Sequence, residues 1–213
     1  MLKHQEYYDS THLLLYNKNI VMQHTNIKDF DYTTTYFNHY RNLENTVMDL
    51  KITNERIKLV KKYSSDIVCD FGIGCGSFIS KMKKNIFGYD INPIGINWLK
   101  ENKIYINPYC DDHNHIKCWT LWDVLEHLKN PFDFLKIINP NDFLFLSIPI
   151  FNSFSNLSKN KHFKPNEHLF YYKEEGLIKL CKNMNFILLE SDNIETELGR
   201  ENIKRYVFQK KEK

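Results

Sequence analysis

The chain lacks several features that define special classes of protein. Only 7 of its 213 residues are glycine and 6 are proline, which is not the composition of a disordered or collagen-like chain. The formal net charge is only +3, too small for the phosphate footprint of a protein that covers duplex nucleic acid. No apolar run is long enough to cross a bilayer, and the first residues lack the apolar core of a signal peptide. We therefore expect a cytoplasmic protein without membrane or duplex partners.

The cysteines do not form a recognisable framework either. Their number is odd and no CxxC pair occurs, which argues against a zinc site and against a set of disulfides. Two of them fall inside expected strands. We interpret all five as reduced thiols of a cytosolic protein: Cys69, Cys75, Cys110, Cys118 and Cys181.

What the sequence does contain is a regular alternation of strands and helices. At this length we expect one structural domain, with residues 1–64 as an aromatic and helical extension that packs on a core formed by residues 65–213. Within the extension, a helix is expected to begin at Asn54 as its N-cap. Such alternation predicts an α/β fold whose parallel sheet is covered on both faces. The expected strands are 67–71, 86–90, 104–106, 116–122 and 143–148, followed by an antiparallel hairpin of 186–189 and 205–208.

A glycine-rich turn follows the first of these strands, in the stretch IVCDFGIGCGSFIS (67–80). Glycine can take positive φ and lets a ligand lie against the backbone, and the helix expected from Ser77 adds free N–H groups at the same place. The next strand ends in Asp90, whose carboxylate can accept both hydroxyls of a ribose. The pattern predicts a nucleoside-containing cofactor, although a tight turn that needs small residues would look similar.

Two cofactor classes compete for this turn. A dinucleotide fingerprint GxGxxG is incomplete here, because Ser77 and Phe78 stand where the third glycine would fall, so a NAD-dependent oxidoreductase is the alternative. In contrast, DFGIGCG resembles the DxGxGxG motif of class I S-adenosylmethionine-dependent methyltransferases. WTLWDVLEHLKNP (119–131) is similar to the fourth-strand region of small-molecule methyltransferases related to the ubiquinone-pathway O-methyltransferases. Three later stretches, IPIFN, HFKPNEHLFYY and GREN, resemble short methyltransferase-domain proteins of unassigned substrate.

This resemblance implies a Rossmann-like three-layer sandwich. Its mostly parallel seven-stranded sheet would have the order 3-2-1-4-5-7-6 and end in the antiparallel hairpin, with residues 65–213 as the methyltransferase domain. By the same likeness, S-adenosylmethionine would be the cofactor and Asp123 would lie beside the methyl donor. The cofactor-binding residues would be Asp70, Gly72, Gly74 and Gly76 at the methionine part, Asp90 at the ribose, and Ile91 and Asp111 (in preference to Asp112) at the adenine.

Methyl transfer from a sulfonium is an in-line displacement, so the protein mainly has to position and desolvate the two reactants. If the acceptor is a hydroxyl, His127 is the first candidate for a general base, beside Asp123. The alternative is that His127 only supports its loop. We expect acceptor contacts from the loop after the fifth strand, or else plain packing by the same residues: His162, Lys164, His168 and Tyr171.

The sequence leaves the acceptor open. The motifs of amino-methylating DNA enzymes and of base C5 methyltransferases are absent, which favours an O or N atom of a small-molecule or nucleotide-like substrate. A catalytically silent domain that keeps the pocket only to fold or to dock on a partner is a further alternative. Tyr36 and Tyr40 could lie over the cofactor on one helical face, or simply pack.

Metal assistance is a variant of the same hypothesis. Asp123, Glu126 and His127 form DxxEH, and some relatives with a glutamate-rich version of this motif hold a divalent cation. Oxygen ligands with an imidazole would suit magnesium or manganese. Many relatives carry VLEH without a metal, however, and the site expected from the sequence therefore contains none.

Overall fold

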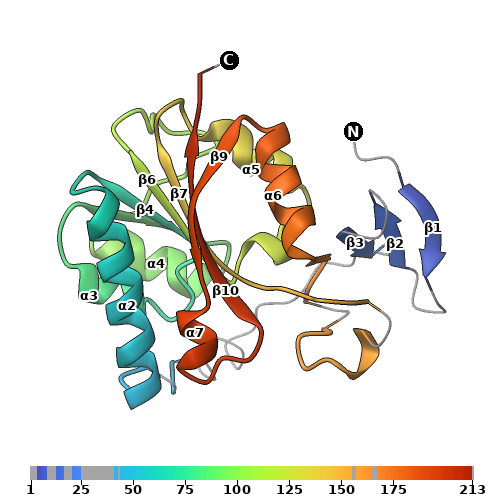
Figure 1. Ribbon diagram of the computed structural model, residues 1–213. Helices are drawn as coiled ribbons and strands as arrows, with labels where there is room; N and C mark the ends of the chain where they lie inside the picture. The colour runs from blue at the N-terminus through green and yellow to red at the C-terminus, as the bar shows by residue number, and fades with distance from the viewer. Residues whose placement is uncertain are drawn as a thin grey trace.

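The main sheet of the protein has the topology that the strand and helix alternation predicts. The computed structural model describes residues 4–8, 13–16, 21–24, 41–42, 44–154, 157–164 and 167–212. Its six-stranded sheet has the order β5-β4-β6-β7-β10-β9 (Figure 1). The first four strands are parallel, and β10 runs antiparallel to both β7 and β9. The strands are β4 (Val68–Phe71), β5 (Ile86–Tyr89), β6 (Cys118–Trp122), β7 (Phe143–Pro149), β9 (Phe186–Asp192) and β10 (Ile203–Lys210).

This arrangement confirms the Rossmann-like fold with its closing antiparallel hairpin. The seventh strand expected at 104–106 is reduced to a single parallel bridge between Gly88 and Tyr105, on the outer side of β5. The position of that bridge completes the predicted strand order. The loop of the hairpin also contains a short helix that the sequence analysis missed, α7 (Ile194–Glu197).

Helices cover both faces of the sheet, because successive strand residues point to opposite sides. On one face, Trp119 and Leu144 pack in a core cluster with residues of α5 (Pro131–Ile137) and α6 (Glu174–Asn183). On the other, Cys118 and Phe145 pack with residues of α2 (Val47–Tyr63), α3 (Ser77–Met82) and α4 (Pro93–Glu101). Figure 1 shows these two helical layers on either side of the strands.

Helix α2 begins earlier than the sequence analysis predicted. Its N-cap is Thr46, whose side chain accepts a hydrogen bond from the backbone N–H of Asp49, whereas Asn54 lies inside the helix. The prediction was wrong because the first two turns expose Val47, Met48 and Leu50, and therefore lack the clean apolar stripe that marks a helix start in sequence. The longer helix reaches over the carboxyl ends of the strands, where it lines the site described below.

A second, smaller sheet has the order β1-β2-β3-β8 and is antiparallel. Its strands β1 (His4–Tyr8), β2 (Leu13–Tyr16) and β3 (Val21–His24) lie in the N-terminal extension, for which only an aromatic and helical character was predicted. The fourth strand, β8 (Phe170–Tyr172), comes from the segment after β7. The N-terminal segment is thus paired with the loop for which we predicted acceptor contacts.

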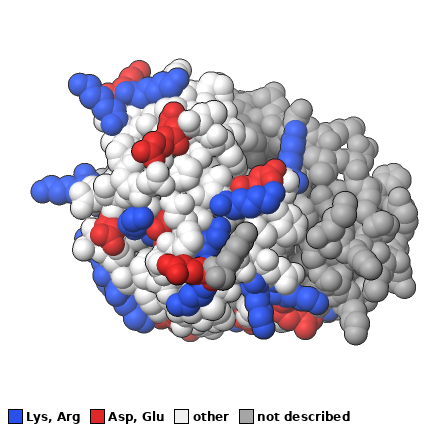
Figure 2. All heavy atoms as spheres, turned by 90° about the horizontal axis from the view of Figure 1, so that it is seen from above, with Lys and Arg blue, Asp and Glu red and all other residues white. Residues whose placement is uncertain are grey.

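The surface and the cysteines agree with the low net charge and the absence of a disulfide framework. Basic and acidic side chains are interspersed on the face shown in Figure 2. All five cysteines are free, and Cys69, Cys118 and Cys181 are buried in the core. Among the described residues, no helix is long and apolar enough to cross a membrane.

Candidate active site

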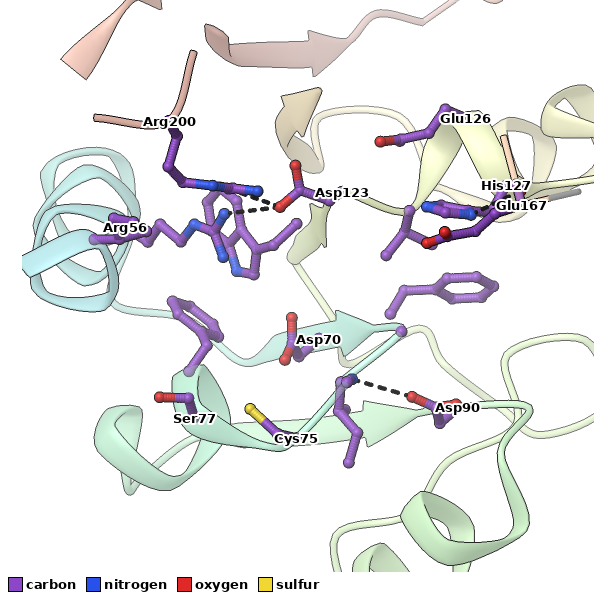
Figure 3. A pocket seen from close by; sticks show the side chains of 18 of the residues that line it. Arg56, Asp70, Cys75, Ser77, Asp90, Asp123, Glu126, His127, Glu167 and Arg200 are labelled. Atoms are coloured by element: carbon purple, nitrogen blue, oxygen red, sulfur yellow. Dashed lines mark hydrogen bonds and ion pairs between the residues drawn. The ribbon is translucent and has the colours of Figure 1, made fainter. Parts of the chain in front are cut away.

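A cavity of about 620 Å³ lies beyond the carboxyl ends of β4, β5 and β6. This is the edge of a parallel α/β sheet at which ligands bind, because the helices diverge there. Its walls come from α2, the turn after β4, the ends of β5 and β6, the 3-10 turn η1 (Leu125–His127), the segment before β8 and the loop after α7 (Figure 3). The cavity size suits a ligand of small-molecule or nucleoside dimensions.

The glycine turn forms one wall of the cavity. Gly72, Gly74 and Gly76 all have positive φ, at 82°, 55° and 84°. A Cβ at Gly72 would lie 2.6 Å from Cγ2 of Val124, so that position admits only glycine without rearrangement. At Gly74, by contrast, a Cβ would meet nothing within 4 Å among the described residues, because this residue borders the open cavity. The backbone at Gly74 is therefore open to the cavity.

Asp90 sits at the end of β5 and is tied to this turn. Its carboxylate accepts hydrogen bonds from the backbone N–H groups of Gly74 (3.2 Å) and Asn92 (2.8 Å). It is 8% exposed, and burial outweighs these hydrogen bonds and raises its pKa. Asp90 thus lines the cavity while also fixing the turn.

Asp70 is a buried carboxylate on the floor of the cavity. It is 2% exposed, and its Oδ1 accepts a hydrogen bond from the hydroxyl of Thr120 at 2.8 Å. Burial raises its pKa to about 7, against the lowering effects of Thr120 and the Arg56 charge. A cationic group of a ligand placed beside Asp70 would favour its ionised form.

Asp123 lies in an ion-pair cluster at the end of β6. Its Oδ2 accepts hydrogen bonds from Arg56 of α2 (3.1 Å) and from Arg200 in the loop after α7 (2.8 Å). Arg56 and Arg200 also both bind the fully buried Glu195 of α7. The two guanidinium groups overcome the effect of burial and hold the pKa of Asp123 far below its usual range. Asp123 has a positive φ of 59°, and Figure 3 shows both arginines approaching it from the same side.

On the opposite wall, three side chains with lone pairs lie together. Glu126 and His127 project into the cavity from η1 (Figure 3), and the ring of His168, just before β8, lies 4.7 Å from the ring of His127 and at 87° to it. Burial lowers the pKa of His127, and burial with neighbouring positive groups lowers that of His168 to about 3, so both imidazoles are neutral near pH 7. Burial and the Asp123 charge raise the pKa of Glu126 well above its usual range.

Most of the predicted site residues line this one cavity. They are Asp70, Gly72, Gly74, Asp90, Ile91, Asp123, His127, His162, Lys164 and His168. Gly76 does not line it, but forms the N-cap of α3 behind the turn. The cofactor, substrate and catalytic roles assigned to these residues remain predictions.

Besides Gly76, two predicted residues lie outside the cavity lining. The carboxylate of Asp111 accepts a hydrogen bond from the N–H of Asn107 at 2.7 Å and closes a turn outside the cavity lining. Tyr171 is fully buried in a cluster with Phe151 and Phe163, which corresponds to the packing alternative for that loop. Tyr36 and Tyr40 lie outside the described residues.

Sequence reasoning missed Arg56, Glu195 and Arg200. A signal for the first was present, because Arg56 stands four residues from both Ile52 and Val60, on the buried face of its helix. A charge on an apolar stripe requires a buried partner. Glu195 carried no such signal. Arg200 lies in the stretch GREN (199–202), which contributed to the family resemblance but was assigned no role in the site.

Comparison with known proteins identifies the family. The family model described as a methyltransferase domain matches residues 38–191, more than half of the chain. The chain belongs to the methyltransferase domain family. No curated protein matches it significantly in sequence.

Solved structures share the fold of this methyltransferase domain at low sequence identity. Magnesium protoporphyrin IX methyltransferase (ChlM) from Synechocystis PCC 6803 with bound SAH has a TM-score of 0.62 and 13% identity, with 84% of this chain and 95% of that chain covered. A SAM-dependent methyltransferase from Methanosarcina mazei has a TM-score of 0.54 and 14% identity, with 73% and 98% covered. The [4+2]-cyclase SpnF has a TM-score of 0.53 and 9% identity, with 74% and 80% covered.

These findings confirm S-adenosylmethionine as the expected cofactor at the level of the family. They also favour the methyltransferase over the NAD-dependent oxidoreductase. The presence of a cyclase among the neighbours means that the fold by itself does not decide the reaction.

Proposed function

We propose that this methyltransferase domain transfers the methyl group of S-adenosylmethionine to an O or N atom of a small-molecule or nucleotide-like acceptor. The observation that carries the proposal is the position of the cavity. It lies against the open backbone of Gly74 and next to Asp90, in a domain whose family is that of methyltransferases.

In this proposal the two walls have different tasks. Asp70, the glycine turn and Asp90 hold the cofactor, with Asp90 at the ribose and Ile91, which is exposed to the cavity mouth, at the adenine. The acceptor lies between the cofactor and the wall that contains His127, within reach of His162 and Lys164. Asp123 acts as a positioning residue, since its Oδ2 is already held by two arginines.

The chain's own residues supply the conditions that methyl transfer requires. The reaction forms a bond between the acceptor and carbon while the sulfur–carbon bond breaks, and its electron pair stays on sulfur. Positioning and exclusion of water account for most of the rate enhancement in such a displacement. His127 donates from Nδ1 to the carbonyl oxygen of Glu167 at 2.9 Å, which leaves the Nε2 lone pair available for a proton or another ligand.

The proposal is tested by calorimetry with S-adenosylhomocysteine, comparing the wild type with Gly74→Ala. The added methyl group meets open space in the protein, so we expect folding to persist and affinity to fall at least about tenfold, because the ligand needs that space. Asn185→Ala is the matched control, since Asn185 also has positive φ (65°) but lies between α6 and β9, away from the cavity lining.

Three outcomes would count against the proposal. A wild-type protein that is stabilised by NAD(H) and not by S-adenosylhomocysteine would be an oxidoreductase. Equal affinities of the wild type and Gly74→Ala would refute contact between the cofactor and the turn. Binding of S-adenosylmethionine without formation of S-adenosylhomocysteine on addition of hydroxyl- and amine-containing acceptors would indicate the silent domain.

A further inference from the structure

The side chains of Glu126, His127 and His168 meet on the acceptor side of the cavity. One potential ligand atom from each residue lies within 4.8 Å of the other two. Two imidazole nitrogens and a carboxylate that converge in this way can bind a metal ion in proteins.

The environment of these atoms is what distinguishes the cluster from ordinary packing. Glu126 is 1% exposed and His168 is 4% exposed. Three of their buried atoms form no hydrogen bond within the described part of the chain. These are both carboxylate oxygens of Glu126 and Nδ1 of His168. Buried polar atoms almost always have partners, so three such atoms at one point are suited to binding a cation.

The backbone around the cluster holds these side chains in place. The N–H of Leu169 donates to the carbonyl oxygen of Glu126 at 2.8 Å, which fixes His168 next to η1. The hydrogen bond from His127 Nδ1 to the Glu167 carbonyl fixes the orientation of the second ring. Ligating histidines are usually oriented by such a bond from their other ring nitrogen.

We propose that Glu126, His127 and His168 bind one divalent transition-metal ion whose open coordination positions face the cavity. Two nitrogen donors favour zinc, cobalt or manganese over magnesium, which prefers oxygen ligands. Asp123 is not a ligand, because both Arg56 and Arg200 are bound to it and their charges oppose a cation there. The site therefore differs from the Asp123, Glu126 and His127 set considered from the sequence.

A metal ion at this site would restrict the chemical class of the acceptor. This inference rests on the proposed methyl transfer. A metal at this wall would coordinate the acceptor through oxygen and lower the pKa of a coordinated hydroxyl. The hydroxyl proton then passes to water, the oxygen forms the new bond to the methyl carbon, and the sulfonium becomes a thioether. We therefore infer an O-methyltransferase of hydroxyl compounds.

The metal site is tested by titrating EDTA-dialysed full-length protein with Co²⁺, followed by its visible absorption, and with Zn²⁺ and Mg²⁺ by calorimetry. We expect one Co²⁺ or Zn²⁺ per chain and much weaker binding of Mg²⁺. Glu126→Gln and His168→Gln should each lower the affinity by more than about 100-fold, since changes beyond the ligands already cost 10–100-fold.

His162→Gln is the matched control for a cavity-lining histidine outside the cluster. Its ring Nε2 is bound to the carbonyl oxygen of Glu201, and we expect metal affinity to be unchanged. Glu126→Gln should also abolish the Tm increase that Zn²⁺ causes in the wild type, because it removes one of the three ligands.

Binding that is equally strong in Glu126→Gln and His168→Gln, or weakened equally by His162→Gln, would overturn the proposal. The same holds for tighter binding of Mg²⁺ than of Co²⁺. Parallel titrations with S-adenosylhomocysteine distinguish failure of the metal proposal from failure of the proposed methyl transfer. Loss of cofactor binding alone would refute methyl transfer, and loss of metal binding alone would refute only the metal site.

Discussion

Asp70 is an acidic side chain in a buried position that disfavours its charged form at neutral pH. It belongs to a fully buried strand, and among the described residues the one side chain that donates a hydrogen bond to its carboxyl group is the neutral hydroxyl of Thr120. Burial raises its pKa to about 7, whereas an unfolded chain ionises it near pH 4. Folding therefore stabilises the protonated form, and a bound cation is needed to offset the cost of the ionised one.

We predict that this carboxyl group makes the free protein less stable as the pH rises. Its stabilising contribution is fully present below about pH 4 and is lost as the pH increases through about 7, by on the order of 4 kcal/mol. Urea unfolding of the wild type and Asp70→Asn between about pH 4 and pH 8 measures the effect. Asparagine, like the protonated carboxyl, is neutral and can still accept the Thr120 hydrogen bond. The two curves should therefore lie closest near pH 4 and diverge as the pH rises, with the wild type losing stability relative to Asp70→Asn. Parallel curves would contradict the prediction.

The residues of the site divide into those that local sequence can predict and those that it cannot. Gly72, Gly74 and Asp90 follow directly after strands, and strand ends in a parallel sheet meet at one edge, so their convergence was predictable. Arg200 joins Asp123 across 77 positions of the chain. Such a contact depends on the exact path of the hairpin loop, which no local pattern specifies.

At the scale of elements, α2 is the part of the N-terminal region that completes the site. Arg56 donates to Glu195 through both Nε (2.7 Å) and Nη2 (2.9 Å), and Nη2 also reaches Ser147 of β7. The helix is also joined to α3, where the Ser77 hydroxyl donates to Asp49 and Lys81 forms an ion pair with it. The wall of the cavity formed by α2 is therefore held by polar contacts as well as by the core.

Arg56→Ala should destabilise the protein by about 3 kcal/mol, because it leaves the fully buried Glu195 with one fewer cationic partner. Lys58→Ala on the same helix is the control. Lys58 is 72% exposed and forms an exposed ion pair with Glu55 on its own helix, so we expect a change below about 0.5 kcal/mol. Urea unfolding at pH 7 compares the two, and equal effects would show that the cluster contributes nothing beyond helix propensity.

The predicted elements were those with local signals. Apolar runs predicted the parallel strands, and the glycine turn predicted the start of α3 at Ser77, whereas the strand at 104–106 is too short to form more than one bridge. β8 was not predicted, because its main partner is β3, almost 150 residues earlier in the chain. Pairing of this kind is determined by tertiary structure and leaves no periodic pattern in either segment.

At the scale of the whole molecule, β10 holds the C-terminal half of the sheet together. It pairs with β7 from Ile203 to Gln209 and with β9 from Arg205 to Lys210. Tyr206 and Phe208 belong to one core cluster and Val207 to the other. The strand β10 therefore joins two neighbouring strands and contributes buried side chains to the cores on both faces of the sheet.

We predict that a chain ending after Asn202 does not fold cooperatively. The edge strand β9 would lose the strand it pairs with in this sheet, β7 would keep only β6, and both clusters would lose buried side chains. A chain ending after Lys210 keeps every pair of the strand and serves as the control. Thermal unfolding followed by circular dichroism distinguishes them. A sharp transition in the shorter chain would show that the remaining sheet is sufficient.

The ion-pair cluster has a consequence for the order in which the molecule is built. Arg56 and Glu195 are 139 positions apart, and contacts between such distant residues form late because the intervening chain must first be ordered. While the chain is being synthesised, the glycine turn and Asp90 are made long before Glu195 and Arg200. A nascent chain thus contains the wall formed by the glycine turn and Asp90 before Glu195 and Arg200 exist. We therefore expect the complete cavity, with Asp123 held by both arginines, only in the finished polypeptide.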